Sequence, residues 1–171
     1  MAIKNFCAMI VYRIVGNKKV GLELEFLLTF YRDKKGTMDI KFPGGLDKPG
    51  EIPVVAAVRE LREETGLEAD ELFAQHVFTK NIDSNFALQF FMVPMEQVGG
   101  NMITRPRSPS DQGFDQENIG VPVWMQFNRH LLDPILYPDH AEALIAALKQ
   151  LAKVNSDLFF LITRHVRLCE L

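Results

Sequence analysis

The sequence predicts an α/β sandwich with a mixed central sheet. Segments rich in β-branched and aromatic residues surround one strongly amphipathic helix, and a second amphipathic helix follows near the end of the chain. This order of strands and helices favours a mixed sheet over a doubly wound parallel sheet. With 171 residues and 47% hydrophobic residues, the chain is expected to form one domain, 1–171, with its own core.

Three strands are expected before the first helix. Asn5–Val15 is rich in β-branched and aromatic residues. Val20–Arg32 alternates at its start and then becomes continuously apolar, which predicts a long strand buried on both faces towards its end. After a turn at residues 33–36, a short strand at Met38–Phe42 leads into Pro43-Gly44-Gly45.

The first helix is expected at Pro53–Thr65. Proline suits the first helical position, and Gly66 suits the C-terminal stop. Two further strands are expected at Leu72–Thr79 and Asn85–Val93, and Val121–Phe127 looks extended.

Residues 99–120 are dominated by Gly, Pro, Ser, Asp and Gln without a period, which predicts a flexible segment or a functional flap. The second helix is expected at Asp139–Val154, and the apolar segment Leu158–Ile162 follows it.

Charge and composition exclude several classes of protein. The formal net charge of −3 gives no basic excess of the kind that broad nucleic-acid or membrane binders carry. Four basic residues interrupt the apolar stretch within residues 1–20, so no leader is expected, and no apolar run is long enough to span a membrane. Cys7 and Cys169 form no disulfide or zinc pattern. We therefore expect a cytoplasmic protein.

Three carboxylates on the first predicted helix share one face. At about 100° per residue, Glu63 lies roughly 60° behind Glu60, and Glu64 lies roughly 40° ahead of it. Like charges at this spacing cost about 0.2–0.5 kcal/mol each, and a divalent cation would reverse that cost. Oxygen ligands favour Mg²⁺, Mn²⁺ or Ca²⁺ over zinc. The structural alternative is a solvated helix in which Arg59 and Glu63 form an i,i+4 ion pair.

The residues around this helix favour the metal hypothesis. The segment Gly45–Leu67 contains a single pattern. Five residues separate Gly45 from Glu51, and seven more lead to Arg59-Glu60-Leu61. After one residue come Glu63-Glu64, and after one more Gly66-Leu67. This pattern resembles the Nudix box at every fixed position. The preceding Phe42-Pro43-Gly44 and the later Trp124 also fit, so the chain is identified as a member of the Nudix hydrolase family.

The resemblance implies a Nudix-type α/β/α sandwich in which the box forms a loop–helix–loop. It implies that the carbonyl of Gly45 and the carboxylates of Glu60, Glu63 and Glu64 hold Mg²⁺ (or Mn²⁺). By the same analogy, Glu51 pairs with Arg59 and keeps the helix in place.

The activity implied is hydrolysis of a nucleoside diphosphate linked to another moiety, or of a nucleoside triphosphate. By family analogy, a general base comes from the box or from a glutamate in a later loop. Glu117 is the candidate for the latter, with Asp115 and Glu96 as alternatives. Arg105 and Arg107 are candidate phosphate-binding residues in the segment 99–120.

Two other functions compete with this interpretation. One is a nucleotide-binding regulatory module without catalysis, which would more often lack box acids; the other is an RNA-end processing enzyme, for which no basic stripe is evident. A homodimer is a further hypothesis, because Val55 is expected on the wet side of the helix and Leu158–Ile162 is the candidate to cover it.

Overall fold

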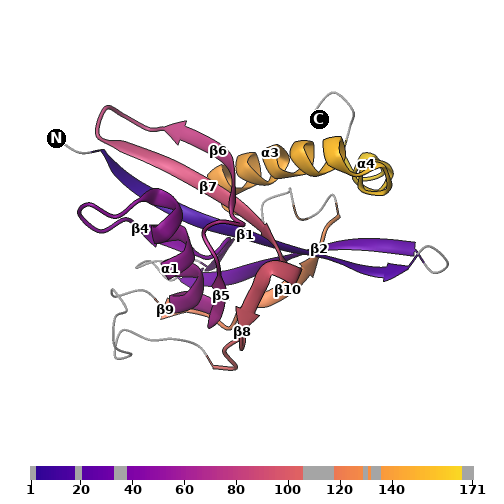
Figure 1. Ribbon diagram of the computed structural model, residues 1–171, viewed down its shortest axis with the longest axis horizontal. Coiled ribbons are helices and arrows are strands. Elements are labelled where there is room, and N and C mark those ends of the chain that lie inside the picture. The colour runs from indigo at the N-terminus through magenta and orange to yellow at the C-terminus, as the bar shows by residue number, and fades with distance from the viewer. Residues whose placement is uncertain are drawn as a thin grey trace.

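A computed structural model describes residues 3–17, 21–32, 38–105, 118–128, 131 and 136–166 (Figure 1). Within these ranges the strands are β1 (Lys4–Asn17), β2 (Gly21–Arg32), β3 (Met38–Lys41), β4 (Gly44–Leu46), β5 (Leu67–Ala69), β6 (Gln75–Asn81), β7 (Phe86–Pro94), β8 (Val98–Gly100), β9 (Asn118–Ile119) and β10 (Val123–Gln126). The helices are α1 (Pro53–Thr65), α3 (Pro138–Val154) and α4 (Ser156–Thr163), and a 3-10 turn spans Met95–Gln97.

The central sheet is mixed. Its main strands lie in the order β10-β2-β1-β7-β6, and β3 and β9 also pair with β2 while β4 pairs with β1. β1 and β7 are parallel, whereas the other pairs in this sheet are antiparallel. β5 and β8 form a separate antiparallel pair. A parallel pair inside an otherwise antiparallel sheet requires a crossover, and α1 lies in the connection between β1 and β7.

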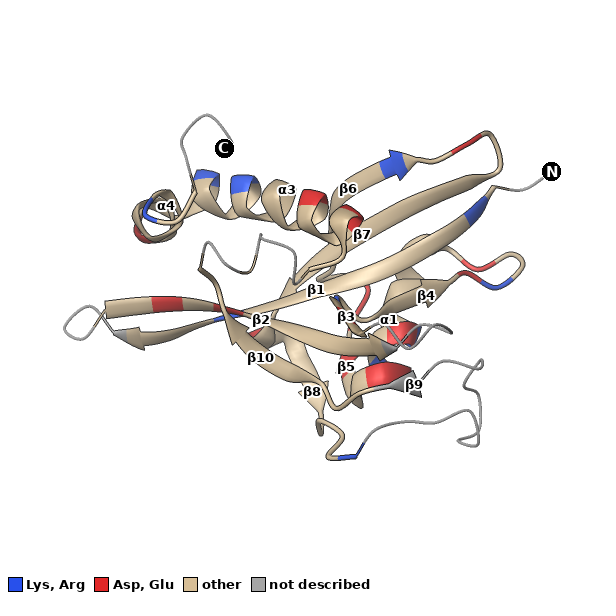
Figure 2. Ribbon diagram, turned by 180° about the vertical axis from the view of Figure 1, so that it is seen from behind, with Lys and Arg blue, Asp and Glu red and all other residues tan. Residues whose placement is uncertain are grey.

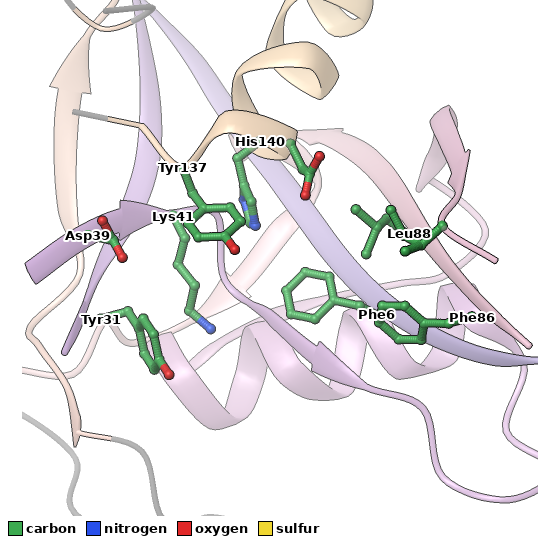
Figure 3. Close-up of a pocket in the computed structure, with 10 residues that line it drawn as sticks. Phe6, Tyr31, Asp39, Lys41, Phe86, Leu88, Tyr137 and His140 are labelled. Atoms are coloured by element: carbon green, nitrogen blue, oxygen red, sulfur yellow. The ribbon is translucent and has the colours of Figure 1, made fainter. Parts of the chain in front are cut away.

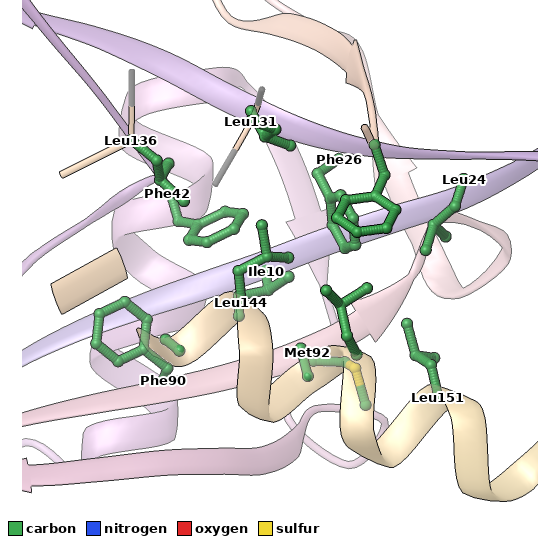
Figure 4. Close-up of a cluster of buried hydrophobic side chains, with 14 of the residues drawn as sticks. Ile10, Leu24, Phe26, Phe42, Phe90, Met92, Leu131, Leu136, Leu144 and Leu151 are labelled. Atoms are coloured by element: carbon green, nitrogen blue, oxygen red, sulfur yellow. The ribbon is translucent and has the colours of Figure 1, made fainter. Parts of the chain in front are cut away.

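Helices cover both faces of the sheet. Figure 1 shows α3 and α4 on one side of the strands and α1 on the other. Alternate residues of β1 therefore enter two different cores. Ala8 and Ile10 pack in the cluster beneath α3 and α4, while Cys7, Met9 and Val11 pack in the cluster beneath α1. Figure 4 shows the first cluster, in which Leu144 and Leu151 of α3 meet the strands. The predicted α/β/α sandwich with a mixed sheet is confirmed.

β1 and β2 diverge towards one end of the sheet. They pair only where Tyr12–Asn17 faces Gly21–Phe26. Beyond that point β2 pairs with β3, and β1 pairs with β4. The two residues that connect β3 to β4 fill the gap. Phe42 is fully buried there, and the carbonyl of Pro43 accepts a 2.9 Å hydrogen bond from the N–H of Met9.

Local signals in the sequence place the long elements well. The helix predicted at Pro53–Thr65 has those bounds, with Pro53 at its start and Gly66 in the left-handed conformation (φ 77°) at its end. The strand predicted at Leu72–Thr79 begins only at Gln75, because residues 71–73 form a turn in which Leu72 is 84% exposed.

The C-terminal apolar segment forms a helix, α4. Leu158, Leu161 and Ile162 of this helix pack into the core beneath α3, on the sheet face opposite α1. The expectation that this segment covers Val55 of α1 is therefore wrong for a single chain. No helix in the described ranges is long and apolar enough to cross a membrane.

Candidate active site

The C-terminal half of α1 carries the acidic residues, which Figure 2 marks in red. The buried side chains of this helix include Ala57, Leu61 and Glu64. Glu64 is therefore part of the packed face and does not project into solvent. The helix lies against β1, β4, β5 and β7, so its acidic face meets the Gly44-Gly45 segment at the diverging end of the sheet.

Arg59 organises three carboxylates. Its Nε and Nη2 donate to the two oxygens of Glu51 at 2.8 and 2.9 Å, in the bidentate geometry expected from the sequence. Nη1 donates to Glu60 at 2.6 Å and to Glu63 at 3.1 Å, and Nη2 also donates to the carbonyl of Leu46 at 3.0 Å. All five guanidinium N–H groups are thereby used. The hydrogen bond from Arg59 holds the pKa of Glu51 below its usual value.

Glu60 lies directly against Gly45. A Cβ atom at residue 45 would stand 2.6 Å from the carboxylate carbon of Glu60, closer than any real side chain approaches. Only glycine permits this approach between loop and carboxylate. The pKa of Glu60 is raised to about 7: burial is the largest cause, the hydrogen bond and charge of Arg59 oppose it, and the charges of Glu64 and Glu63 add to it.

Glu64 is held by a buried cation, Lys41. The ammonium of Lys41 donates to Glu64 at 3.0 Å and to the carbonyl of Gly44 at 2.9 Å, with the two side chains only 9% and 4% exposed. Glu64 also accepts hydrogen bonds from the N–H of Gly44 at 3.2 Å and the hydroxyl of Thr29 at 3.4 Å. These contacts offset part of the cost of burying two charges.

The donors at this end of α1 suit a hard divalent cation. Across the described ranges, no three His, Cys, Asp or Glu side chains stand in an arrangement that would hold a metal, because Arg59 and Lys41 engage the carboxylates. Among the described residues, Arg59 and Lys41 contact the carboxylates of Glu51, Glu60, Glu63 and Glu64, and the ligands that this end of the helix offers are oxygens. The backbone of Gly45 lies in close contact with the carboxylate of Glu60. The oxygen donors of Gly45, Glu60, Glu63 and Glu64 are of the type that Mg²⁺ or Mn²⁺ prefers, and their binding of such an ion stays a prediction.

A cavity of about 360 Å³ lies at the diverging end of the sheet. Figure 3 shows Phe6 and Tyr31 on one side, Tyr137 and His140 from the start of α3 on another, and Lys41 between them. The described residues that line it are Phe6, Tyr31, Asp39, Lys41, Ile82, Phe86, Leu88, Tyr137, Asp139 and His140. The size, and a wall in which half of these residues carry aromatic rings, are typical of a site for a small organic ligand.

Lys41 joins this pocket to the acidic end of α1. Its ammonium, bound to Glu64, lies 5.8 Å from the centre of the Phe6 ring and 5.4 Å from that of Tyr31. One cation therefore contacts the carboxylate of α1 and the aromatic wall of the pocket together. The sequence did not reveal this role, because Lys41 and Glu64 are 23 positions apart and the pairing depends on the fold.

The other predicted residues fall into two groups. Arg105 lies in an exposed segment beyond the end of α1, where the N–H of Ile103 donates to the carbonyl of Thr65 at 2.8 Å. Its proposed phosphate contact stays a prediction. Arg107, Asp115 and Glu117, together with most of the segment predicted as flexible at 99–120, lie outside the described residues.

Glu96 does not belong to the acidic site. It lies beside Tyr12, whose pKa is raised by burial and by the charge of Glu96. The acidic site lies instead near Cys7, whose pKa of about 12 reflects burial first and then the charges of nearby acids, Glu51 and Glu60 among them. Tyr12 and Cys7 are five residues apart on β1, about 16 Å along the strand.

Comparisons with known proteins agree with this fold. A family model described as the NUDIX domain matches residues 9–146, which is most of the chain. The chain therefore belongs to the NUDIX family. The class expected from the sequence, a Nudix hydrolase acting on a phosphoric anhydride bond, is confirmed at this level. No curated protein is matched.

Several solved structures share the fold at low sequence identity. A MutT/nudix family protein from Enterococcus faecalis aligns with a TM-score of 0.58 and 15% identity, over 90% of this chain and 63% of its own length. A mutT/nudix family protein from Listeria innocua gives 0.54 and 17%, over 90% and 96%. A protein described as an ADP compounds hydrolase gives 0.59 and 16%, over 88% and 74%. These identities support the shared fold alone.

Gly44 and Gly45 should respond differently to alanine. A Cβ at residue 44 would stand 2.6 Å from the backbone of Ala8, whereas at residue 45 it would meet the movable end of Glu60. We expect Gly44→Ala to lower the free energy of unfolding by about 1–3 kcal/mol and Gly45→Ala to lower it by less than about 1 kcal/mol. Urea denaturation of both variants tests this, and equal losses would contradict it.

Breaking the buried ion pair should be costly. Lys41→Met leaves the Glu64 carboxylate in the interior without the Lys41 ammonium, so we expect a loss of about 3–5 kcal/mol in the free energy of unfolding. The double variant Lys41→Met/Glu64→Leu should recover most of that loss. Denaturation of both single variants and of the double variant gives the coupling free energy between Lys41 and Glu64. A double variant that loses the sum of the two single losses in unfolding free energy would contradict the ion pair.

His140 should make stability depend on pH. Burial, with a smaller effect of the Lys41 charge, lowers the pKa of His140 from 6.5 to about 3. As the pH falls below 6.5, the unfolded chain binds a proton that the folded protein does not, so stability falls, by up to about 1.4 kcal/mol per pH unit. Denaturation between about pH 7 and pH 4 should show a shallower fall for His140→Asn, and parallel curves would contradict this.

Proposed function

We propose that this protein is a Mg²⁺-dependent pyrophosphohydrolase that cleaves a nucleoside diphosphate linked to another moiety, or a nucleoside triphosphate. One observation carries the proposal. The acidic end of α1 and an aromatic pocket of about 360 Å³ meet at Lys41, which contacts both. A substrate with an aromatic ring and a diphosphate has the two chemical parts that these neighbouring sites accept.

The residues divide the work as follows. Gly45, Glu60, Glu63 and Glu64 would hold the cation, which neutralises the diphosphate and lowers the pKa of a bound water. Attack by water on one phosphorus breaks a P–O bond to the bridging oxygen, and two phosphate-bearing products leave. Arg59 gathers the carboxylates of Glu51, Glu60 and Glu63, and Glu60 and Glu63 would turn from Arg59 to the cation when it binds.

Lys41 supplies positive charge where the diphosphate would enter. Its ammonium lies between Glu64 and the aromatic rings of the pocket, and a phosphate chain running from the pocket to α1 passes beside it. An ammonium stabilises the charge that grows on phosphate oxygens as the bond breaks. Arg105, Arg107 and a base at Glu117 are further proposals from the sequence, as are a cytoplasmic location and a homodimer.

A hydrolysis screen tests the proposal. The panel contains ADP-ribose, sugar nucleotides, dinucleoside polyphosphates, dinucleotide cofactors, coenzyme A and nucleoside triphosphates, each with Mg²⁺ and with EDTA. We expect Mg²⁺-dependent cleavage of one class, with products that locate the broken bond. Glu63→Gln should lower the turnover roughly 100-fold or more.

Glu68→Gln is the matched control, because Glu68 is an exposed acid in β5, beyond α1. It should retain the activity of the unmodified protein. Cleavage that is equal in Glu63→Gln, or that persists in EDTA, would contradict the metal assignment. Absence of cleavage across the panel, with nucleotide binding retained, would favour the regulatory module instead.

A further inference from the structure

His140 is a polar residue in the wall of the pocket. It belongs to the first turn of α3 and is only 4% exposed. Its Nδ1 accepts a 3.0 Å hydrogen bond from the backbone N–H of Phe42. In a neutral imidazole one nitrogen accepts and the other carries the proton, so this bond places the proton of His140 on Nε2.

The Nε2–H group has no protein acceptor in the described part of the chain. Among the described residues, the side chain of His140 makes one hydrogen bond, which it accepts at Nδ1. Every buried side-chain nitrogen or oxygen in the same ranges has a partner. Nε2 therefore belongs to the small exposed part of the side chain, which lines the pocket (Figure 3).

Neighbouring rings fix the direction of this donor. The imidazole stacks on Phe42 at 5.8 Å with an interplanar angle of 22°, and Phe90 contacts it at 4.9 Å and 89°. Tyr137 and Phe6 approach it edge-on at 5.9 and 5.7 Å. The low pKa of about 3 keeps the ring uncharged at neutral pH. His140 thus presents one oriented, neutral N–H group to whatever enters the pocket.

We propose that His140 is a specificity residue whose Nε2–H donates a hydrogen bond to an acceptor on the edge of the substrate's nucleobase. The acceptor is a ring nitrogen or a carbonyl oxygen, and the base packs against the aromatic walls that Phe6, Tyr31 and Tyr137 provide. This inference rests on the proposed function, because the nucleobase is the part of that substrate which the pocket would take.

A neutral donor of fixed direction selects by chemistry as well as by shape. A ring that offers an N–H to His140 leaves two donors facing each other and loses the bond, whereas a ring with an acceptor there completes it. Two of the other charged groups that line the pocket are engaged by partners, and Asp39 lines it as well. Lys41 binds Glu64, and Asp139 accepts a 2.9 Å hydrogen bond from Lys80. His140 is therefore a neutral donor in the pocket wall that can contact the edge of the base.

Two substitutions separate this role from a structural one. In His140→Asn the short amide places an oxygen near the position of Nδ1, so the bond from Phe42 is kept and the donor in the pocket is lost. In His140→Gln the longer amide places an N–H near Nε2, so the donor is kept and the bond from Phe42 is lost. His165→Asn is the matched control, since His165 contacts Phe127 and does not line the pocket.

The measurement is calorimetric binding of AMP, GMP, CMP and UMP, with inorganic pyrophosphate as a probe without a base. For the monophosphate that binds most tightly, we expect His140→Asn to raise Kd about 3- to 10-fold, the effect of one lost hydrogen bond. His140→Gln should stay within about 2-fold of the unmodified protein while its Tm falls. Neither variant should change pyrophosphate binding, and His165→Asn should bind all five probes normally.

Several outcomes would overturn the inference. Binding that survives in His140→Asn and is lost in His140→Gln would show that His140 acts only through Phe42. An equal loss for monophosphates and pyrophosphate would show a general disturbance of the site. If none of the four monophosphates binds while the hydrolysis screen shows turnover, the pocket does not take the base. The proposed function has its own test: absence of cleavage of every compound in the hydrolysis screen would contradict it.

Discussion

The buried ion pair between Lys41 and Glu64 is the interaction on which the rest of the site depends. Both charges lie in the interior, where their desolvation is costly and is offset by their attraction and by hydrogen bonds from Gly44 and Thr29. The pair ties the acidic end of α1 to β3 at the place where β1 and β2 separate. Since Glu64 is fixed inside, Glu60 is brought against the Gly45 backbone, and Glu63 lies within reach of Arg59.

The separation of β1 from β2 creates the space for the pocket, which is the second part of the site. Where β1 and β2 no longer pair, a space opens between them, and residues at the start of α3 line one side of it. Phe42 fills the inner part of that space and also donates its backbone N–H to His140. The segment 41–45, from the end of β3 into β4, thus positions Lys41 at the junction of the two sites, His140 in the pocket, and Gly44 and Gly45 beside α1.

Features encoded by neighbouring residues were predictable from the sequence. The bounds of α1 follow from Pro53 and Gly66, and the common face of its acids follows from helical spacing. The bidentate pair of Glu51 and Arg59 followed from the resemblance to the Nudix box, and the structure contains it.

Features that depend on distant contacts were not predictable. The two- and three-residue strands β4, β5, β8 and β9 exist only through their partners, and two of them contain glycines that carry no strand signal. The sequence also places Glu64 on the acidic face without showing that it is buried, because its partner Lys41 comes from another strand. The one available signal for His140 is its place four residues before Leu144, on the stripe of α3 that faces the core.

The most direct test of this account is a crystal structure of the protein with Mg²⁺ and a non-hydrolysable α,β-methylene analogue of the substrate that the screen identifies. We predict that the two phosphorus atoms lie between Lys41 and the carboxylates of α1, and that the ring lies in the pocket formed by Phe6, Tyr31 and Tyr137. A ring bound outside that pocket, or a diphosphate bound away from Lys41, would contradict the claim that the two sites act on one substrate.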